Sequence, residues 1–451
     1  MKKILFALLL IIITGAAAGA ENFCGTNEKM LSPAFWTRAR GMKKEILLPK
    51  QVFTLSQNIK ATSKTYCVDI TAYPELISKE KVMEELANFS KRPKSERFLG
   101  PAPASDTFWQ SLEAQTNTGS VRETTVVRFA VAVQNAALKT LPTDEPLYSE
   151  PNDLLFDMNV ESTLKIWEPL AILHASADGK WYFTVSPTAS GWLHAEAAAF
   201  TDKKTITETA SRDFYTVTGN RVTTDLRTEA ADAGRREFFM GTKLPKADDV
   251  ETAGGVASDF SYLVLVPERS PDGSLRVATE RIPRAADVTA GYLPCTEENI
   301  VKQAFKMLGE RYGWGGMFSA RDCSAFTRDV YACFGIELPR NSGAQTKIPS
   351  ARWNAAKMTA DEKKKLLTKC HAGTLLQMPG HIMLYLGTVN NKPYIIHDVY
   401  ALGPSGRAGA DGRRTINCVA VTDMEMTRKD GTSVIDNVTN IVTMMPEKSG
   451  K

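Results

Sequence analysis

Cys323 is the residue of this 451-residue chain that is best placed to act as a nucleophile. It follows a glycine-rich segment, residues 312–316, and precedes residues 324–334, whose apolar side chains recur at helical spacing. A thiol at a helix N-terminus lies near unpaired amides and the positive end of the helix dipole, so we expect the setting to favour thiolate. The alternative is an ordinary buried or disulfide-bonded cysteine.

Two downstream histidines could complete a cysteine-hydrolase site. His381 begins a predicted strand and is the expected base, and His397 on the next predicted strand is expected to hold it in its working tautomer. Because strand side chains alternate, a two-residue turn at Asn390 and Asn391 would place the two rings on opposite faces. An odd-length loop or a bulge is therefore needed, and we predict the odd-length loop.

The residues around the cysteine have structural as well as functional interpretations. The backbone amide of Cys323 is the expected oxyanion donor, and a side chain such as Tyr312 could assist it. Asp322 is the predicted helix cap, with substrate contact as the alternative. Ser324 could cap the helix or touch substrate, and Trp314 could pack in the core or line the cleft.

Composition and charge exclude several other functions. The formal net charge is only +4, and no basic stripe indicates nucleic-acid binding. Cys370 and His371 together suggest zinc, but their spacing from the other histidines fits no closed zinc motif. We expect no metal and no cofactor, and we predict no protein partner.

Residues 1–20 are a predicted secretory signal. Lys2 and Lys3 form a charged start, residues 4–14 are an apolar run too short for a membrane span, and residues 18–20 form an A-x-A cleavage site. We therefore expect secretion to the periplasm or cell envelope, without a transmembrane anchor. Six of the 7 cysteines could then form disulfides and leave one free, but the sequence does not select a pairing.

The rest of the chain divides into four predicted segments. Short strands and hairpin dipeptides, such as Asp178-Gly179, indicate small barrels in the second and third segments. The Gly-Trp-Leu at residues 191–193 resembles a late-strand element of bacterial SH3-like domains. The predicted fold is multidomain α+β: a mixed structural segment at 21–124, SH3-like β-barrels at 125–203 and 204–293, and an α+β domain at 294–451.

Four motifs near the C-terminus carry a family resemblance. Residues 312–316 match Y-x-W-G-G, residues 322–325 match D-C-S-G except for Ala at its last position, and residues 380–387 match G-H-x-x-x-Y-x-G. Residues 339–345 read P-R-x-x-x-x-Q, and His397 matches a later strand histidine. Over about residues 295–445 the chain thus resembles the NlpC family of papain-like bacterial cell-wall cysteine peptidases.

The resemblance implies Cys323 as nucleophile, His381 as base and His397 as third member, on a papain-like α+β fold. It also implies that the partners are peptidoglycan-derived peptides, cleaved between γ-D-glutamate and a diamino acid such as meso-diaminopimelate. The domain order resembles members that require a free N-terminal L-alanine. A carboxylate and an aromatic ring would suit its ammonium, and the candidates are Asp157, Glu161 and Trp192.

Two other functions stay open. The chain could be a catalytically inactive cell-wall-binding protein that uses its SH3-like domains. It could also be an acyltransferase or amidase on the same fold.

Overall fold

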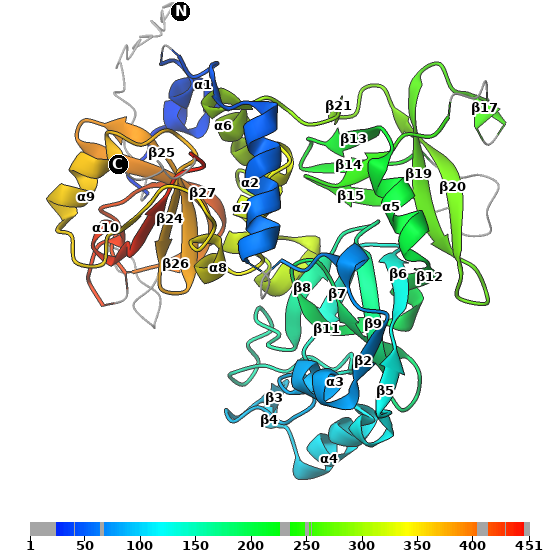
Figure 1. Cartoon of the computed structure of the whole chain (residues 1–451). Coiled ribbons are helices and arrows are strands. Elements are labelled where there is room, and N and C mark those ends of the chain that lie inside the picture. The colour runs from blue at the N-terminus through cyan, green and yellow to red at the C-terminus, as the bar shows by residue number, and fades with distance from the viewer. Residues whose placement is uncertain are drawn as a thin grey trace, which may run out of the picture.

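Figure 1 shows the computed structural model of the chain. It describes residues 24–39, 41–63, 67–225, 235–248, 252–253, 255–403, 414–428 and 430–445. The predicted signal at residues 1–20 lies outside these ranges. None of the described helices combines the length and the apolar character that crossing a membrane requires.

The N-terminal segment contributes to two different parts of the molecule. Helices α1 (Pro33–Trp36) and α2 (Pro49–Thr62) share a core with the C-terminal domain, and β1 (Glu45–Leu47) pairs with β22 (Cys295–Thr296). Farther along, β2 (Leu76–Ser78), α3 (Lys79–Leu86), α4 (Asp106–Gln115) and β5 (Thr124–Val126) follow. Helix α3 packs into the core of the first barrel, beneath which α3 and α4 lie in Figure 1.

The first barrel is a seven-stranded sheet in the order β12-β6-β9-β10-β11-β7-β8. Its hairpin between β9 and β10 turns at Gly179, whose φ of 71° suits glycine. The strands are β6 (Arg128–Ala132), β7 (Ala136–Lys139), β8 (Val160–Leu164), β9 (Pro169–Ala175), β10 (Trp181–Val185), β11 (Ser190–His194) and β12 (Ala198–Thr201).

Small antiparallel sheets around a separate apolar core form the next part of the chain. The long hairpin turns at Gly273, as the Asp-Gly dipeptide predicts. That this part is a second SH3-like barrel stays a prediction. Its main elements are α5 (Lys203–Ser211), β13 (Phe214–Val217), β14 (Arg221–Thr223), β15 (Glu237–Phe239), β16 (Lys243–Pro245), β19 (Ser261–Arg269), β20 (Leu275–Pro283) and β21 (Val288–Ala290).

The C-terminal domain is a six-stranded antiparallel sheet, β23-β28-β24-β25-β26-β27, covered on both faces. On strand β25, Ile382 and Leu384 pack in the core that contains α6 and α7, whereas Met383 and Tyr385 pack in the core that contains α9. The two faces of this strand therefore belong to two different apolar cores. The elements are α6 (Glu297–Phe305), α7 (Cys323–Ala332), α8 (Ser342–Gln345), β23 (Arg352–Asn354), α9 (Ala360–Leu367), β24 (Leu375–Met378), β25 (His381–Val389), β26 (Lys392–Leu402), β27 (Arg414–Asp423), α10 (Val434–Asn437) and β28 (Asn440–Val442).

The turn between β25 and β26 corrects one prediction. Asn390 and Asn391 form a two-residue turn with φ of 49° and 64°, so the predicted odd-length loop is wrong. Instead, a bulge between Tyr385 and Gly387 adds one residue to β25. As a result, Leu384 pairs with Ile396 and not with His397. This shift by one residue places the side chains of the two strand histidines on the same face of the sheet.

A buried ion pair joins the first barrel to α7, and two more surround Arg321 within the C-terminal domain. Lys165 at the end of β8 lies 2.6 Å from Asp329 of α7 and donates to the carbonyl of Met240, also at 2.6 Å. Arg321 contacts Glu310 at 2.6 Å and Asp329 at 2.7 Å. Lys165 thus joins the first barrel both to α7 and to the β segment that follows the barrel, which helps to hold this helix in place.

Candidate active site

Cys323 is the first residue of α7, as the sequence predicts, and its position follows from the cap. The Asp322 side chain accepts hydrogen bonds from the amides of Ser324 at 3.1 Å and Ala325 at 2.9 Å, which begins the helix. Cys323 is a free thiol and only 7% exposed. The backbone of Ile382 hydrogen-bonds its sulfur, so the thiol lies against the start of β25, next to His381.

The protonation state of the thiol differs from the sequence-based expectation. Burial raises the pKa of Cys323 to about 12, and the Asp322 carboxylate acts in the same direction. Burial lowers the pKa of His381 to about 4, and the Arg428 charge adds to the effect. Both groups are therefore neutral at pH 7, and the prediction of a resting thiolate is wrong. His381 has to accept the proton as the sulfur attacks.

Three side chains form a hydrogen-bonded row behind the thiol. Nε2 of His381 lies 2.8 Å from Nδ1 of His397, and Nε2 of His397 lies 3.1 Å from Oγ1 of Thr422. If Nδ1 of His381 is to accept a proton, its Nε2–H donates to His397, which in turn donates to Thr422. His397 and Thr422 are both fully buried. No sequence motif indicates Thr422, because only strand pairing with β27 brings it here.

Arg340 holds the residues that flank the nucleophile. Its guanidinium contacts both carboxylate oxygens of Asp322, at 2.5 and 3.1 Å, and Oγ of Ser324 at 2.8 Å. Its Nε donates to Oγ of Ser162 in the first barrel, at 2.9 Å. The Asp322 carboxylate is thus engaged in capping and ion pairing. The P-R-x-x-x-x-Q match contains Arg340, but the sequence alone assigns this arginine no role.

The glycine pair of the motif allows the first barrel to approach the catalytic loop closely. Gly315 and Gly316, in η5 (Trp314–Ser319), have φ of 62° and 104°. A Cβ on Gly316 would lie 1.9 Å from Oγ1 of Thr163 on β8, and Thr163 donates to the Gly315 carbonyl at 3.2 Å. Any larger residue would push β8 away from the segment that leads to Cys323.

The three ammonium-binding candidates of the barrel have different positions. Glu161 on β8 lies near the active site: burial raises its pKa, and the charges of Arg340 and Asp322 also act on it. Asp157 is buried, and it binds Lys139 at 3.0 Å. Trp192 is fully buried in the barrel core and donates to the carbonyl of Phe89 at 2.7 Å, so the structure does not bring it to the site.

Aromatic rings form one wall beside the thiol. Phe156 of the barrel region lies between Tyr312, Trp314 and Tyr400, with ring centroids 6.1, 5.9 and 4.8 Å away. Burial raises the pKa of Tyr312, and its ring lies close enough to Cys323 for a thiolate there to raise this pKa further. The sequence indicates Tyr312 and Trp314, whereas Phe156 and Tyr400 carry no motif that would have identified them.

Asp398, next to His397, is an unexpected buried acid. It is fully buried, and neither carboxyl oxygen has a hydrogen-bond partner within the described chain. Burial raises its pKa to about 9, and the Asp322 and Glu310 carboxylates add to this, while Arg321 opposes it. Asp398 is therefore a neutral acid at pH 7.

We expect Asp398→Asn to flatten the pH dependence of stability. The pKa of Asp398 rises from 3.8 to about 9 on folding. The contribution of the protonated carboxyl to the free energy of unfolding is therefore fully present below pH 3.8 and is lost as pH rises toward 9. The loss is at most about 1.4 kcal/mol per pH unit. In urea unfolding the variant should equal the wild type at pH 4 and exceed it at pH 8. The same pH slope in Asp398→Asn, the wild type and the exposed control Asp361→Asn would contradict this.

Two parts of this chain match known protein families. Residues 146–194 match the SH3 domain of the SH3b1 type, and residues 309–400 match the NlpC/P60 family. The probable endopeptidase p60 of Listeria innocua serovar 6a is 51% identical over 47 residues, which is 10% of this chain and 10% of that protein. The p60 of Listeria seeligeri is 53% identical over 47 residues, 10% of this chain and 9% of its own. The chain thus spans about a tenth of the length of these relatives.

A solved structure extends the likeness to most of the chain. An NlpC/P60 endopeptidase from Photobacterium damselae subsp. piscicida superposes with a TM-score of 0.73 at 17% identity, over 92% of this chain and 97% of that one. At this identity the likeness concerns the fold alone. By the family matches, residues 309–400 form an NlpC/P60 domain, and an SH3 domain of the SH3b1 type at residues 146–194 precedes it.

Proposed function

We propose that this protein is a secreted cysteine peptidase that cleaves peptidoglycan stem peptides between γ-D-glutamate and a diamino acid such as meso-diaminopimelate. The observation that carries the proposal is the placement of a free thiol, Cys323, beside the strand that presents the His381–His397 pair, within an NlpC/P60 domain. This combination supplies a nucleophile, a base and a group that orients the base.

The reaction follows from the neutral resting site. As Sγ of Cys323 attacks the γ-carbonyl carbon, Nδ1 of His381 accepts the thiol proton. The backbone N–H of Cys323 donates a hydrogen bond to the oxyanion that forms. Breakdown of the tetrahedral intermediate breaks the C–N bond, and His381 returns its proton to the leaving amine. The thioester is then hydrolysed by a water molecule that His381 deprotonates, which releases the acid and restores the thiol.

We further propose that Glu161 binds the free N-terminal ammonium of the substrate. This carboxyl comes from the barrel, its pKa is raised by burial, and it lies within the electrostatic range of Arg340 and Asp322. An ammonium beside it would favour ionisation and form a charge-assisted hydrogen bond. An acetylated N-terminus offers no positive charge to compensate the buried carboxylate.

For Glu161→Gln we expect kcat/KM on L-Ala-γ-D-Glu-diaminopimelate to fall about 10- to 100-fold, the effect of losing one hydrogen bond to a charged group. Dipeptide release, followed by chromatography, measures this. The N-acetylated peptide should be cleaved by the wild type at least as poorly, with no further loss in the variant. The exposed Glu196→Gln on the same barrel is the matched control. Equal cleavage of the free and the acetylated peptides would contradict the proposal that the substrate needs a free N-terminal ammonium.

The alternative of an inactive cell-wall-binding protein makes a different prediction. In that case the wild-type protein would bind isolated peptidoglycan but would release no dipeptide from it or from the soluble peptide.

A further inference from the structure

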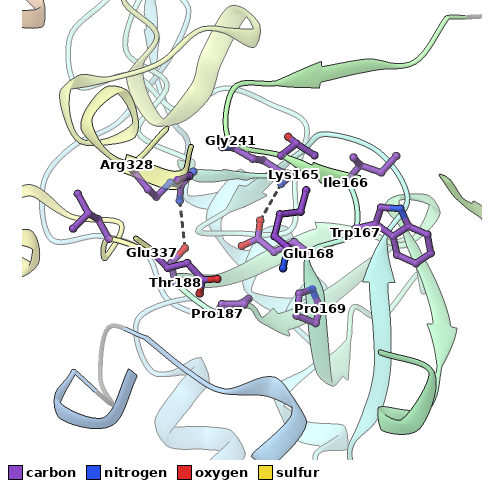
Figure 2. Close-up of a pocket in the computed structure, with 14 residues that line it drawn as sticks. Lys165, Ile166, Trp167, Glu168, Pro169, Pro187, Thr188, Gly241, Arg328 and Glu337 are labelled. Carbon is purple, nitrogen blue, oxygen red and sulfur yellow. Dashed lines mark hydrogen bonds between the residues drawn. The ribbon is translucent and has the colours of Figure 1, made fainter. Parts of the chain in front are cut away.

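A cavity of about 210 Å³ lies where the first barrel, the following β segment and α7 meet (Figure 2). Trp167, Pro169 and Pro187 give it apolar walls, and Arg328 and Glu168 bring opposite charges. None of these five residues takes part in the proposed reaction. Its volume suits a ligand smaller than a drug-sized molecule, for which sites of about 300 Å³ or more are usual.

Five charged residues line the cavity, and three of them are engaged elsewhere: Lys165 pairs with Asp329, Glu337 pairs with Lys60, and Lys243 lies over the rings of Phe214 and Tyr292. The other two, Arg328 and Glu168, make hydrogen bonds to neighbouring residues. Nη1 of Arg328 donates to Oγ1 of Thr188 at 3.3 Å, and Glu168 accepts from the Lys165 amide at 2.9 Å, as the dashed lines in Figure 2 show. Burial raises the pKa of Glu168, while the Arg328 charge opposes the rise, so the guanidinium acts across the cavity. Within the described residues no ion pair joins these two side chains.

A cation and an anion beside an apolar wall indicate a ligand that carries both charges and an apolar group.

We propose that this cavity binds a free α-amino acid with an apolar side chain. Its carboxylate meets Arg328, its ammonium meets Glu168, and its side chain lies against Trp167 and the two prolines. A zwitterion compensates both protein charges at once, which neither an anion nor a cation can do. Since Arg328 belongs to α7 and Glu168 to the barrel, the bound molecule links the barrel to the helix of the nucleophile.

L-Leucine is the probe, titrated calorimetrically into the full chain carrying Glu161→Gln, which weakens ammonium binding at the proposed active site. We expect saturable binding at one site and a rise of the unfolding temperature, because a ligand of the native state stabilises it. N-Acetyl-L-leucine lacks the ammonium and L-leucinamide lacks the carboxylate, and each should bind at least about tenfold more weakly. These two analogues test the proposal without any further substitution.

Arg328→Gln and Glu168→Gln, each in the same background, should abolish the binding of L-leucine. The exposed Arg352→Gln is the matched control and should leave it unchanged. Thermal melts without ligand establish that the variants fold. Absence of L-leucine binding up to about 10 mM, equal binding of the three probes, or binding that survives both substitutions would overturn the proposal.

Discussion

Replacing Cys323 by alanine is expected to lower stem-peptide hydrolysis at least about ten-thousandfold, the usual cost of removing a catalytic nucleophile. No other group in the described site can form the thioester, and the His381 base alone would have to activate water. Release of the dipeptide L-Ala-γ-D-Glu, followed by chromatography with long incubations, measures the loss.

Cys333→Ala is the matched control for this experiment. Cys333 follows the same helix and is fully buried, and burial raises its thiol pKa to about 12, as for Cys323. Its replacement should leave the rate within a few-fold of wild type. Retained hydrolysis in Cys323→Ala, or equal losses in the two variants, would show that the thiol at the start of α7 is not the nucleophile.

Local signals in the sequence were sufficient to predict the elements that carry the site. The cap at Asp322 and the helical spacing after it place Cys323 at the start of α7. Thr296, a residue type that favours the N-cap position, caps α6 by accepting a hydrogen bond from the Asn299 amide at 3.0 Å. These features depend on neighbours within a few residues, and such short-range information is present in a single sequence.

What the sequence did not reveal depends on pairing and burial. The bulge at Tyr385–Gly387 has no distinctive local pattern, although it decides which face His397 occupies. The resting protonation of Cys323 depends on how completely the fold encloses the thiol, a quantity that helix position alone does not give. Thr422 and Asp398 reach the site only because β26 and β27 pair.

The split of the N-terminal segment is another long-range result. Ile59 of α2 lies in the core that contains Phe326 of α7, whereas Leu86 of α3 lies in the core of the first barrel. Periodicity indicates an apolar face on each helix but not which domain covers that face. The segment was therefore predicted as one unit, whereas in the structure its helices pack against two different domains.

Replacing Arg340 by glutamine is expected to destabilise the protein by about 3–5 kcal/mol, because it leaves a buried carboxylate without its partner. Burial alone would raise the pKa of Asp322, but Arg340 holds it below its ordinary value. The same change removes the hydrogen bonds to Ser324 and to Ser162 of the barrel. Urea unfolding at pH 7 measures the loss.

The pH dependence of this loss identifies its cause. A depressed pKa of Asp322 contributes stability above its unfolded value of 3.8, and this contribution is lost as pH falls through the folded value. The difference between Arg340→Gln and wild type should therefore shrink as the medium becomes acidic. Adding Asp322→Asn should restore part of the stability at pH 7, because an asparagine can still cap α7 without a charge.

Arg92→Gln, which breaks the exposed pair with Asp106, is the control and should cost less than about 1 kcal/mol. A loss in Arg340→Gln that is as small as this control, or one that does not change with pH, would mean that the Asp322 charge does not need Arg340.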